Sequence, residues 1–144
     1  MLIGKLINPG AMEEVKVILV DSNDNKTGLM PKSEAHLKAL LHRAVSVFVV
    51  NSAGEWLIQQ RALQKYHSAG LWTNTCCSHP FPGETNDGAA KRRLMEEMGI
   101  ENCTLTRLFA FTYFQQLENG ITEHEIDHVF LGFSDRHQTR IQLK

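Results

Sequence analysis

A short extended stretch that leads into an amphipathic helix is the feature that most constrains the fold of this chain. Residues 72–78 predict a strand, which prolines and a glycine then end. Residues 86–98 predict a helix, because Ala90, Leu94 and Met98 recur every four positions and can form its buried stripe. Polar residues before this segment and a glycine just after it supply the capping signals.

Strand signals lie on both sides of this pair. Five further segments predict strands from their β-branched or alternating residues: 15–20, 43–51, 55–61, 104–114 and 121–133. The last two flank Asn119 and Gly120, a strong hairpin signal that makes them antiparallel neighbours. Antiparallel strands around one clear helix predict an α+β domain, in which a mixed β-sheet is sandwiched between helices (α/β/α).

The length and composition fit a single soluble domain. The chain has 144 residues, and its 42% hydrophobic and 22% charged residues are ordinary for a globular protein. We expect residues 1–14 to be an N-terminal extension and residues 15–144 to form the domain. A net charge of −1 argues against nucleic-acid binding, and no apolar run approaches the roughly 18 residues of a membrane span. With no export signal and no disulfide framework among its three cysteines, the chain is expected to be cytoplasmic.

The charges of the predicted helix oppose its macrodipole. Glu96 and Glu97 occupy the last turn, whereas Arg92 and Arg93 lie nearer the start. The reverse order would be favoured by roughly 0.3–1 kcal/mol per charge. Surface ion pairs between residues four apart, Arg92–Glu96 and Arg93–Glu97, are one interpretation. A carboxylate cluster that holds Mg²⁺ is the other, and it would compensate for the adverse placement.

Three histidines and two glutamates are candidate metal ligands: His36, His42, His79, Glu123 and Glu125. A turn between the first two histidines could bring both imidazoles to one ion, although they cannot share a face of one straight helix. Glu123, Glu125 and Asp127 project from the same face of a predicted strand, unless that strand is a charged sheet edge. Such a ligand set suits Mn²⁺ or Mg²⁺, with Zn²⁺ also possible.

A thiol and a set of basic residues could complete a site. Cys77 shares a strand face with His79, whereas Cys76 should point into the core. A lone cysteine is usually a small buried apolar residue, but nearby positive charge or a metal would make it reactive. Basic side chains that converged on a cleft could clamp a diphosphate, and otherwise they are solvated surface: Lys32, Arg61, Lys65 and Arg93.

Four segments, in this order along the chain, together carry a family resemblance: Leu41–Phe48, Gln59–Arg61, Trp72–Pro80 and Glu123–Asp127. They resemble the type I isopentenyl-diphosphate isomerases of the Nudix superfamily. The Nudix box is present but altered, because Ser78 replaces its first glycine and Arg93 stands where hydrolases have a glutamate. Losing that carboxylate favours an isomerase over a hydrolase. The rest of the box matches at Glu84, Arg92, Glu96, Glu97 and Gly99.

The resemblance implies a Nudix fold and interconversion of isopentenyl and dimethylallyl diphosphate. It implies a metal site that contains Mn²⁺, Mg²⁺ or Zn²⁺ at the three histidines with Glu123 and Glu125. It also implies that Glu97 holds a Mg²⁺ that bridges to the substrate. The diphosphate would be gripped by four basic residues, Lys32, Arg61, Lys65 and Arg93. Cys77 and Glu125 would flank the isoprenyl chain, with Tyr113 beside Glu125. Family members usually continue into a C-terminal helical segment with a tryptophan that faces the cation. We expect this domain to lack that segment.

Two other functions are compatible with the motifs. One is a Nudix pyrophosphohydrolase that acts on a nucleotide or other diphosphate, which would give Cys77 no role. The other is a catalytically silent Nudix domain that binds a prenyl diphosphate or a partner protein.

Overall fold

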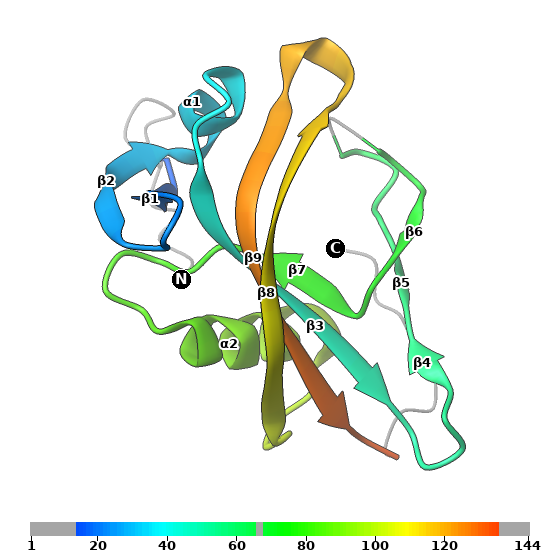
Figure 1. Ribbon diagram of the computed structural model, residues 1–144. Coiled ribbons are helices and arrows are strands. Elements are labelled where there is room, and N and C mark those ends of the chain that lie inside the picture. Colours follow the sequence, from blue (N-terminus) through cyan, green and yellow to red (C-terminus); the bar gives the residue numbers. More distant parts are fainter. Residues whose placement is uncertain (1–13, 66–67, 136–144) are drawn as a thin grey trace, which may run out of the picture.

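A mixed β-sheet forms the centre of the computed structural model, which describes residues 14–65 and 68–135 (Figure 1). All but the last residue of the expected N-terminal extension lies outside the described residues. The strand order is β2-β1-β3-β9-β8, and β3 and β9 run parallel while the other neighbours are antiparallel. The strands are β1 (Lys16–Val20), β2 (Lys26–Pro31), β3 (His42–Val50), β8 (Leu105–Gln116) and β9 (Thr122–Phe133).

Short strands extend this sheet on one side. β4 (Trp56–Leu57) and β7 (Cys76–Ser78) both pair with β3, whereas β5 (Gln59–Gln60) and β6 (Trp72–Thr73) form a separate two-stranded sheet. The sequence predicted one strand over 55–61 and one over 72–78. Each is divided because the chain leaves β3 after β4, pairs with itself through β5 and β6, and returns to β3 through β7.

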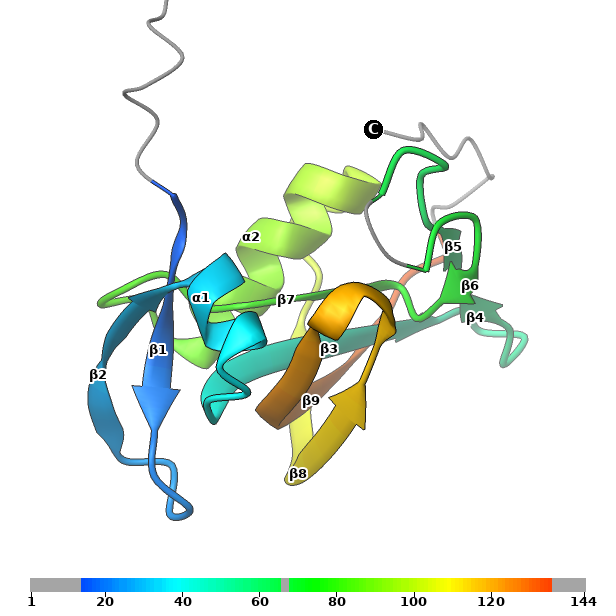
Figure 2. The ribbon, with the colours of Figure 1, turned by 90° about the horizontal axis from the view of Figure 1, so that it is seen from above.

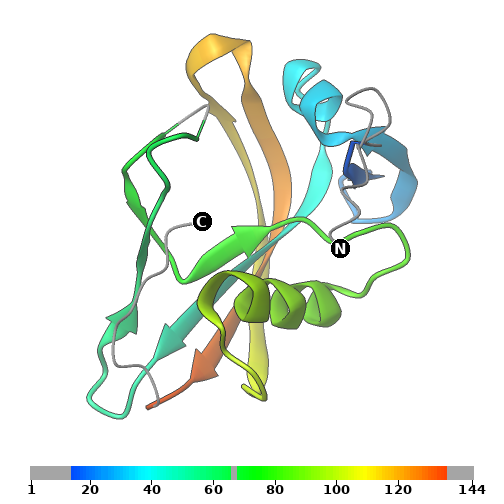
Figure 3. The ribbon, with the colours of Figure 1, turned by 180° about the vertical axis from the view of Figure 1, so that it is seen from behind.

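The predicted helix is present with the predicted bounds, as α2 (Asn86–Met98). The Thr85 hydroxyl accepts a hydrogen bond from the Gly88 N–H at its start, and Gly99 ends it with φ of 66°, a left-handed conformation that suits glycine. Seen from behind, α2 lies across the strands (Figure 3). Its Ala90 and Leu94 are buried against β3, β7 and β9 in a core with Val45, Val47, Val49, Cys76, Ala89, Ile100 and Phe130.

A second helix and its neighbouring strand were not predicted. α1 (Lys32–Leu37) follows Pro31 at the end of β2 and has only six residues, too few for a periodic signal. Viewed from above, α1 and the β1–β2 hairpin lie at one end of the molecule, and β4, β5 and β6 lie at the other (Figure 2). Within the described ranges, no helix is long and apolar enough to cross a membrane.

β9 is an interior strand, so the charged-edge interpretation of its carboxylates is wrong. It pairs with β3 on one side and with β8 on the other. The predicted hairpin joins β8 to β9, and Asn119 and Gly120 both adopt positive φ, at 62° and 72°. Alternate residues of β9, namely Glu123, Glu125 and Asp127, face a cavity that is also lined by residues of β3 and β8.

One ion pair fastens the loop before α2 to the helix. The Arg92 Nε and Nη2 atoms donate to the Glu84 carboxylate at 2.7 and 3.0 Å, and the Phe81 N–H donates to it at 2.8 Å. The Arg92 guanidinium also stacks over the Phe81 ring, 3.7 Å from its centroid. Hydrogen bonds from Arg92, outweighing burial, lower the pKa of Glu84.

We predict that Glu84→Gln lowers the free energy of unfolding at pH 7 by about 1–3 kcal/mol. Because the folded-state pKa of Glu84 is depressed, its contribution is present above the unfolded pKa of about 4.3 and is lost as the pH falls through the folded pKa. Urea unfolding at pH 7 and at about pH 3 should therefore show a difference that shrinks in acid. Glu101→Gln, at an exposed position, is the control. A difference of equal size at both pH values would contradict this account.

Candidate active site

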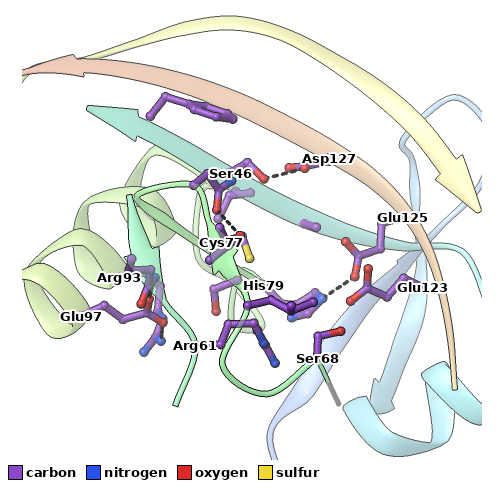
Figure 4. Close-up of a pocket in the computed structure, with 18 of the residues that line it drawn as sticks. Ser46, Arg61, Ser68, Cys77, His79, Arg93, Glu97, Glu123, Glu125 and Asp127 are labelled. Carbon is purple, nitrogen blue, oxygen red and sulfur yellow. Dashed lines mark hydrogen bonds and ion pairs between the residues drawn. The ribbon is translucent and has the colours of Figure 1, made fainter. Parts of the chain in front are cut away.

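A cavity of about 1180 Å³ opens on the face of β3 and β9 that α2 does not cover (Figure 4). It brings together residues from α1, β3, the β5–β6 region, β7, α2, β8 and β9. His42 is fully buried behind the wall. The other site residues expected from the sequence all line this cavity: Lys32, His36, Arg61, Lys65, Cys77, His79, Arg93, Glu97, Tyr113, Glu123 and Glu125.

The three predicted histidines converge on Glu125. His36 comes from α1, His42 begins β3, and His79 follows β7. The Nε2 atoms of His36, His42 and His79 lie 3.9, 3.2 and 2.9 Å from Glu125 Oε1. The parallel register pairs His42 directly with Glu125, which explains this approach. One ligand atom from each of the four residues lies within 4.8 Å of all the others.

The donor atoms of this group fit a divalent cation. The Nε2 atom of His42 and both ring nitrogens of His36 are buried without a hydrogen-bond partner among the described residues. His42 Nδ1 lies 2.8 Å from the Leu40 carbonyl, which can only accept, so Nδ1 carries the hydrogen and Nε2 presents its lone pair. Burial, together with His79 and His42, lowers the pKa of His36 to about 4, so its imidazole is neutral at pH 7. Neutral imidazoles with a carboxylate are ligands for divalent transition metals.

Tyr113 links the two glutamates. Its hydroxyl donates to Glu125 Oε2 at 2.6 Å and lies 3.1 Å from Glu123 Oε2. Burial and the charge of Glu125 raise the pKa of Tyr113 above its ordinary range. Burial would raise the pKa of Glu125, but His42, His79 and Tyr113 hold it below its usual value. Glu123 stands outside the four-residue group, so its place as a fifth ligand stays a prediction.

Cys77 opens into the same cavity as Glu125. It pairs with Ser46 across β3 and β7, and its side chain is exposed to the cavity. The surrounding protein nevertheless desolvates the sulfur and, with the charge of Glu125, raises the pKa of Cys77 to about 11. Cys76 points the other way into the core, as predicted, and is fully buried.

Basic side chains line the cavity, and one of them, Arg93, lies next to Glu97. Gln59 Nε2 donates to Glu97 Oε2 at 2.6 Å, and Arg93 pairs with Glu97 Oε1. The other predicted helical pair also forms, with Arg92 Nη1 at 3.3 Å from Glu96 Oε2. Burial lowers the pKa of Lys32. The role of Glu97 as a Mg²⁺ ligand stays a prediction.

Two polar residues of the cavity, Gln59 and Ser46, were given no role from the sequence, and Asp127 was only placed on the same strand face as Glu123 and Glu125. Gln59 anchors Glu97, and Ser46 donates to Asp127 Oδ2 at 2.6 Å. Burial raises the pKa of Asp127 to about 6, against the hydrogen bond from Ser46. A serine within the apolar run of β3 is the signal that could have drawn attention to this pair.

Comparison with known proteins identifies the family. Residues 40–144 match the NUDIX domain. An isopentenyl-diphosphate Delta-isomerase from Pectobacterium atrosepticum is 56% identical over 124 residues, which cover 86% of this chain and 69% of the relative. This chain belongs to the isopentenyl-diphosphate isomerases of the Nudix family.

Other comparisons agree with this assignment. An isopentenyl-diphosphate Delta-isomerase 2 from Aromatoleum aromaticum is 52% identical, over 85% of this chain and 64% of the relative. The chain thus spans about two thirds of the length of these relatives. A crystal structure from Deinococcus radiodurans matches with a TM-score of 0.69 and 22% identity, over 90% of this chain and 76% of that one. The structural match shows the Nudix fold.

We predict that His36→Ala weakens Mn²⁺ binding by more than about 100-fold, because losing a direct ligand exceeds the typical cost of an outer-shell change. Calorimetric titration of the metal-free protein measures this affinity, and Mn²⁺ should raise the thermal unfolding midpoint of the wild type more than that of the His36 variant. His124→Gln is the matched control, because the His124 ring packs against Phe114 and its Nδ1 lies 2.9 Å from the Ala39 carbonyl. Equal Mn²⁺ affinity in the His36 variant and the wild type would exclude His36 as a ligand.

Proposed function

We propose that this chain interconverts isopentenyl diphosphate and dimethylallyl diphosphate by a reversible 1,3-proton shift. The observation that carries the proposal is that a thiol, on Cys77, and a carboxylate, on Glu125, face one cavity beside a convergent histidine group. The isomerisation requires two proton-transfer groups, because an unactivated alkene must gain a proton on one carbon and lose one from another. The relatives that bear the isomerase name support the same activity.

The proton transfers require one acid and one base on opposite sides of the isoprenyl chain. The acid gives a proton to the terminal CH₂ carbon, the π electrons form the new C–H bond, and a tertiary carbocation results. The base then removes a proton from the carbon nearer the diphosphate, and those bonding electrons form the new double bond. We assign these roles to Cys77 and to Glu125 with Tyr113, and the two groups exchange roles in the reverse direction.

The remaining residues bind and orient the substrate. Four basic side chains would hold the diphosphate: Lys32, Arg61, Lys65 and Arg93. Glu97 would hold a Mg²⁺, whose charge would offset part of the charge of the diphosphate. Phe48 and Trp72, which line the cavity, would pack against the hydrocarbon and could stabilise the cation through their ring faces. Keeping water from the hydrocarbon prevents capture of the cation as an alcohol.

The histidine group would hold a second divalent ion, Mn²⁺, Mg²⁺ or Zn²⁺, with Glu125 and, as proposed, Glu123. The ligands would be His36, His42 and His79 through their ring nitrogens. A bound divalent ion raises the acidity of groups that coordinate it or hydrogen-bond nearby. We also propose that the protein is cytoplasmic, which its three cysteines without a disulfide framework support.

We predict that Cys77→Ala and Glu125→Gln each lower kcat by about 10²–10⁴-fold, the usual contribution of a positioned proton-transfer group. The assay supplies labelled isopentenyl diphosphate with Mg²⁺ and Mn²⁺ and measures the dimethylallyl isomer. Full activity in both variants would refute the assigned roles. Free phosphate or pyrophosphate without isomer would favour a hydrolase, and binding without turnover would favour a silent domain.

A separate prediction concerns the diphosphate. Lys65→Gln should raise KM for isopentenyl diphosphate by about 10-fold and leave kcat within about threefold, because a charge-assisted bond to the diphosphate is made equally before and during reaction. Lys91→Gln, which removes a charge on the exposed side of α2, serves as the control. A fall in kcat at constant KM would instead place Lys65 at the chemical step.

A further inference from the structure

β9 places a third carboxyl group in the cavity wall, that of Asp127, beside those of Glu123 and Glu125. Asp127 is two residues after Glu125 on β9, so both project from the same face of the strand. Its side chain is 94% hidden from solvent, since its exposed fraction is 6%. Oδ2 accepts the hydrogen bond from Ser46 at 2.6 Å, but Oδ1 is buried without a hydrogen-bond partner in the described part of the chain.

Burying a carboxylate oxygen without a hydrogen-bond partner destabilises a protein. Across the sheet, Asp127 pairs with Ala44 on β3 and with Phe111 on β8, neither of which offers a side-chain donor. A buried polar atom of this kind calls for an explanation, and a bound ligand that supplies the missing partner is one. Because Asp127 lines the cavity, a molecule bound there would lie beside this carboxylate.

The position of Asp127 identifies which part of the ligand it meets. Ser46 pairs directly with Cys77 across β3 and β7, and the Ser46 hydroxyl reaches Asp127 on β9. The three side chains therefore form a row across three strands, with Glu125 next to the row (Figure 4). Asp127 lies outside the group of potential metal ligands. It lines the same cavity as Cys77 and Glu125, the two groups assigned to proton transfer.

We propose that Asp127 is a further catalytic residue, whose carboxylate faces the carbon that becomes positively charged and stabilises that charge. This inference rests on the proposed isomerase reaction. No bond to Asp127 forms or breaks: the attraction between opposite charges in a site with little water is the whole effect. Ser46 holds one oxygen, so the Asp127 carboxylate is fixed in the cavity wall before the charge develops.

The test compares two diphosphates of the same shape. One carries a protonated tertiary amine in place of the branched carbon, and the other carries the neutral branched alkyl group. Calorimetry with the metal-supplied protein should show that the wild type prefers the ammonium compound. Asp127→Asn should reduce that preference about 10-fold with unchanged affinity for the alkyl compound, and should lower kcat roughly 100-fold with little change in KM.

Ser46→Ala keeps the Asp127 charge but removes the hydrogen bond that fixes it, so it should reduce the preference for the ammonium compound by about threefold. This variant provides the test if the Asp127 variant does not fold. Glu101→Gln removes a distant exposed carboxylate and should change nothing. Asp127→Asn with wild-type preference and kcat would overturn the inference, and so would loss of bound metal from that variant. If the wild type forms no isomer, the proposed function fails instead.

Discussion

The parallel pairing of β3 with β9 is the contact on which the site depends. Its register places His42 opposite Glu125 and Ala44 opposite Asp127. Parallel neighbours cannot be joined by a tight turn, so the chain needs a long crossover between them. That crossover contains β7, which brings Cys77 and His79 to the cavity, and α2, which brings Arg93 and Glu97. One pairing thus both positions the carboxylates and requires the connection that supplies their partners.

β3 serves the core and the site at once because successive strand residues point to opposite faces. Val45, Val47 and Val49 pack against α2, whereas His42 and Ser46 face the carboxylates of β9. Burying imidazoles and carboxylates is unfavourable by itself, since each loses its contact with water. The apolar face of the same strand offsets this cost. Stability on one side of the sheet therefore permits a chemically demanding arrangement on the other.

Local signals in the sequence sufficed for the long elements. α2 has its predicted bounds because apolar spacing, Thr85 and Gly99 agree, and the β8–β9 hairpin follows from its turn residues. α1 and the division of 55–61 depend on tertiary pairing, which leaves no periodic signal in segments this short. For the site, the family motifs named residues that the fold does gather into one cavity. The hydrogen bonds of Gln59 and Ser46 needed coordinates, because they join residues 38 and 81 positions apart.

Arg92 connects α2 to the histidine group by a hydrogen bond to the backbone of His79. Besides its bonds to Glu84, its Nη2 atom donates to the His79 carbonyl at 3.4 Å. Two residues of the Nudix box, Glu84 and Arg92, therefore support the segment that carries His79. This support uses Arg92 and Glu84, so it does not depend on a carboxylate at position 93. The same helix can therefore support the segment that carries His79, whichever side chain occupies position 93.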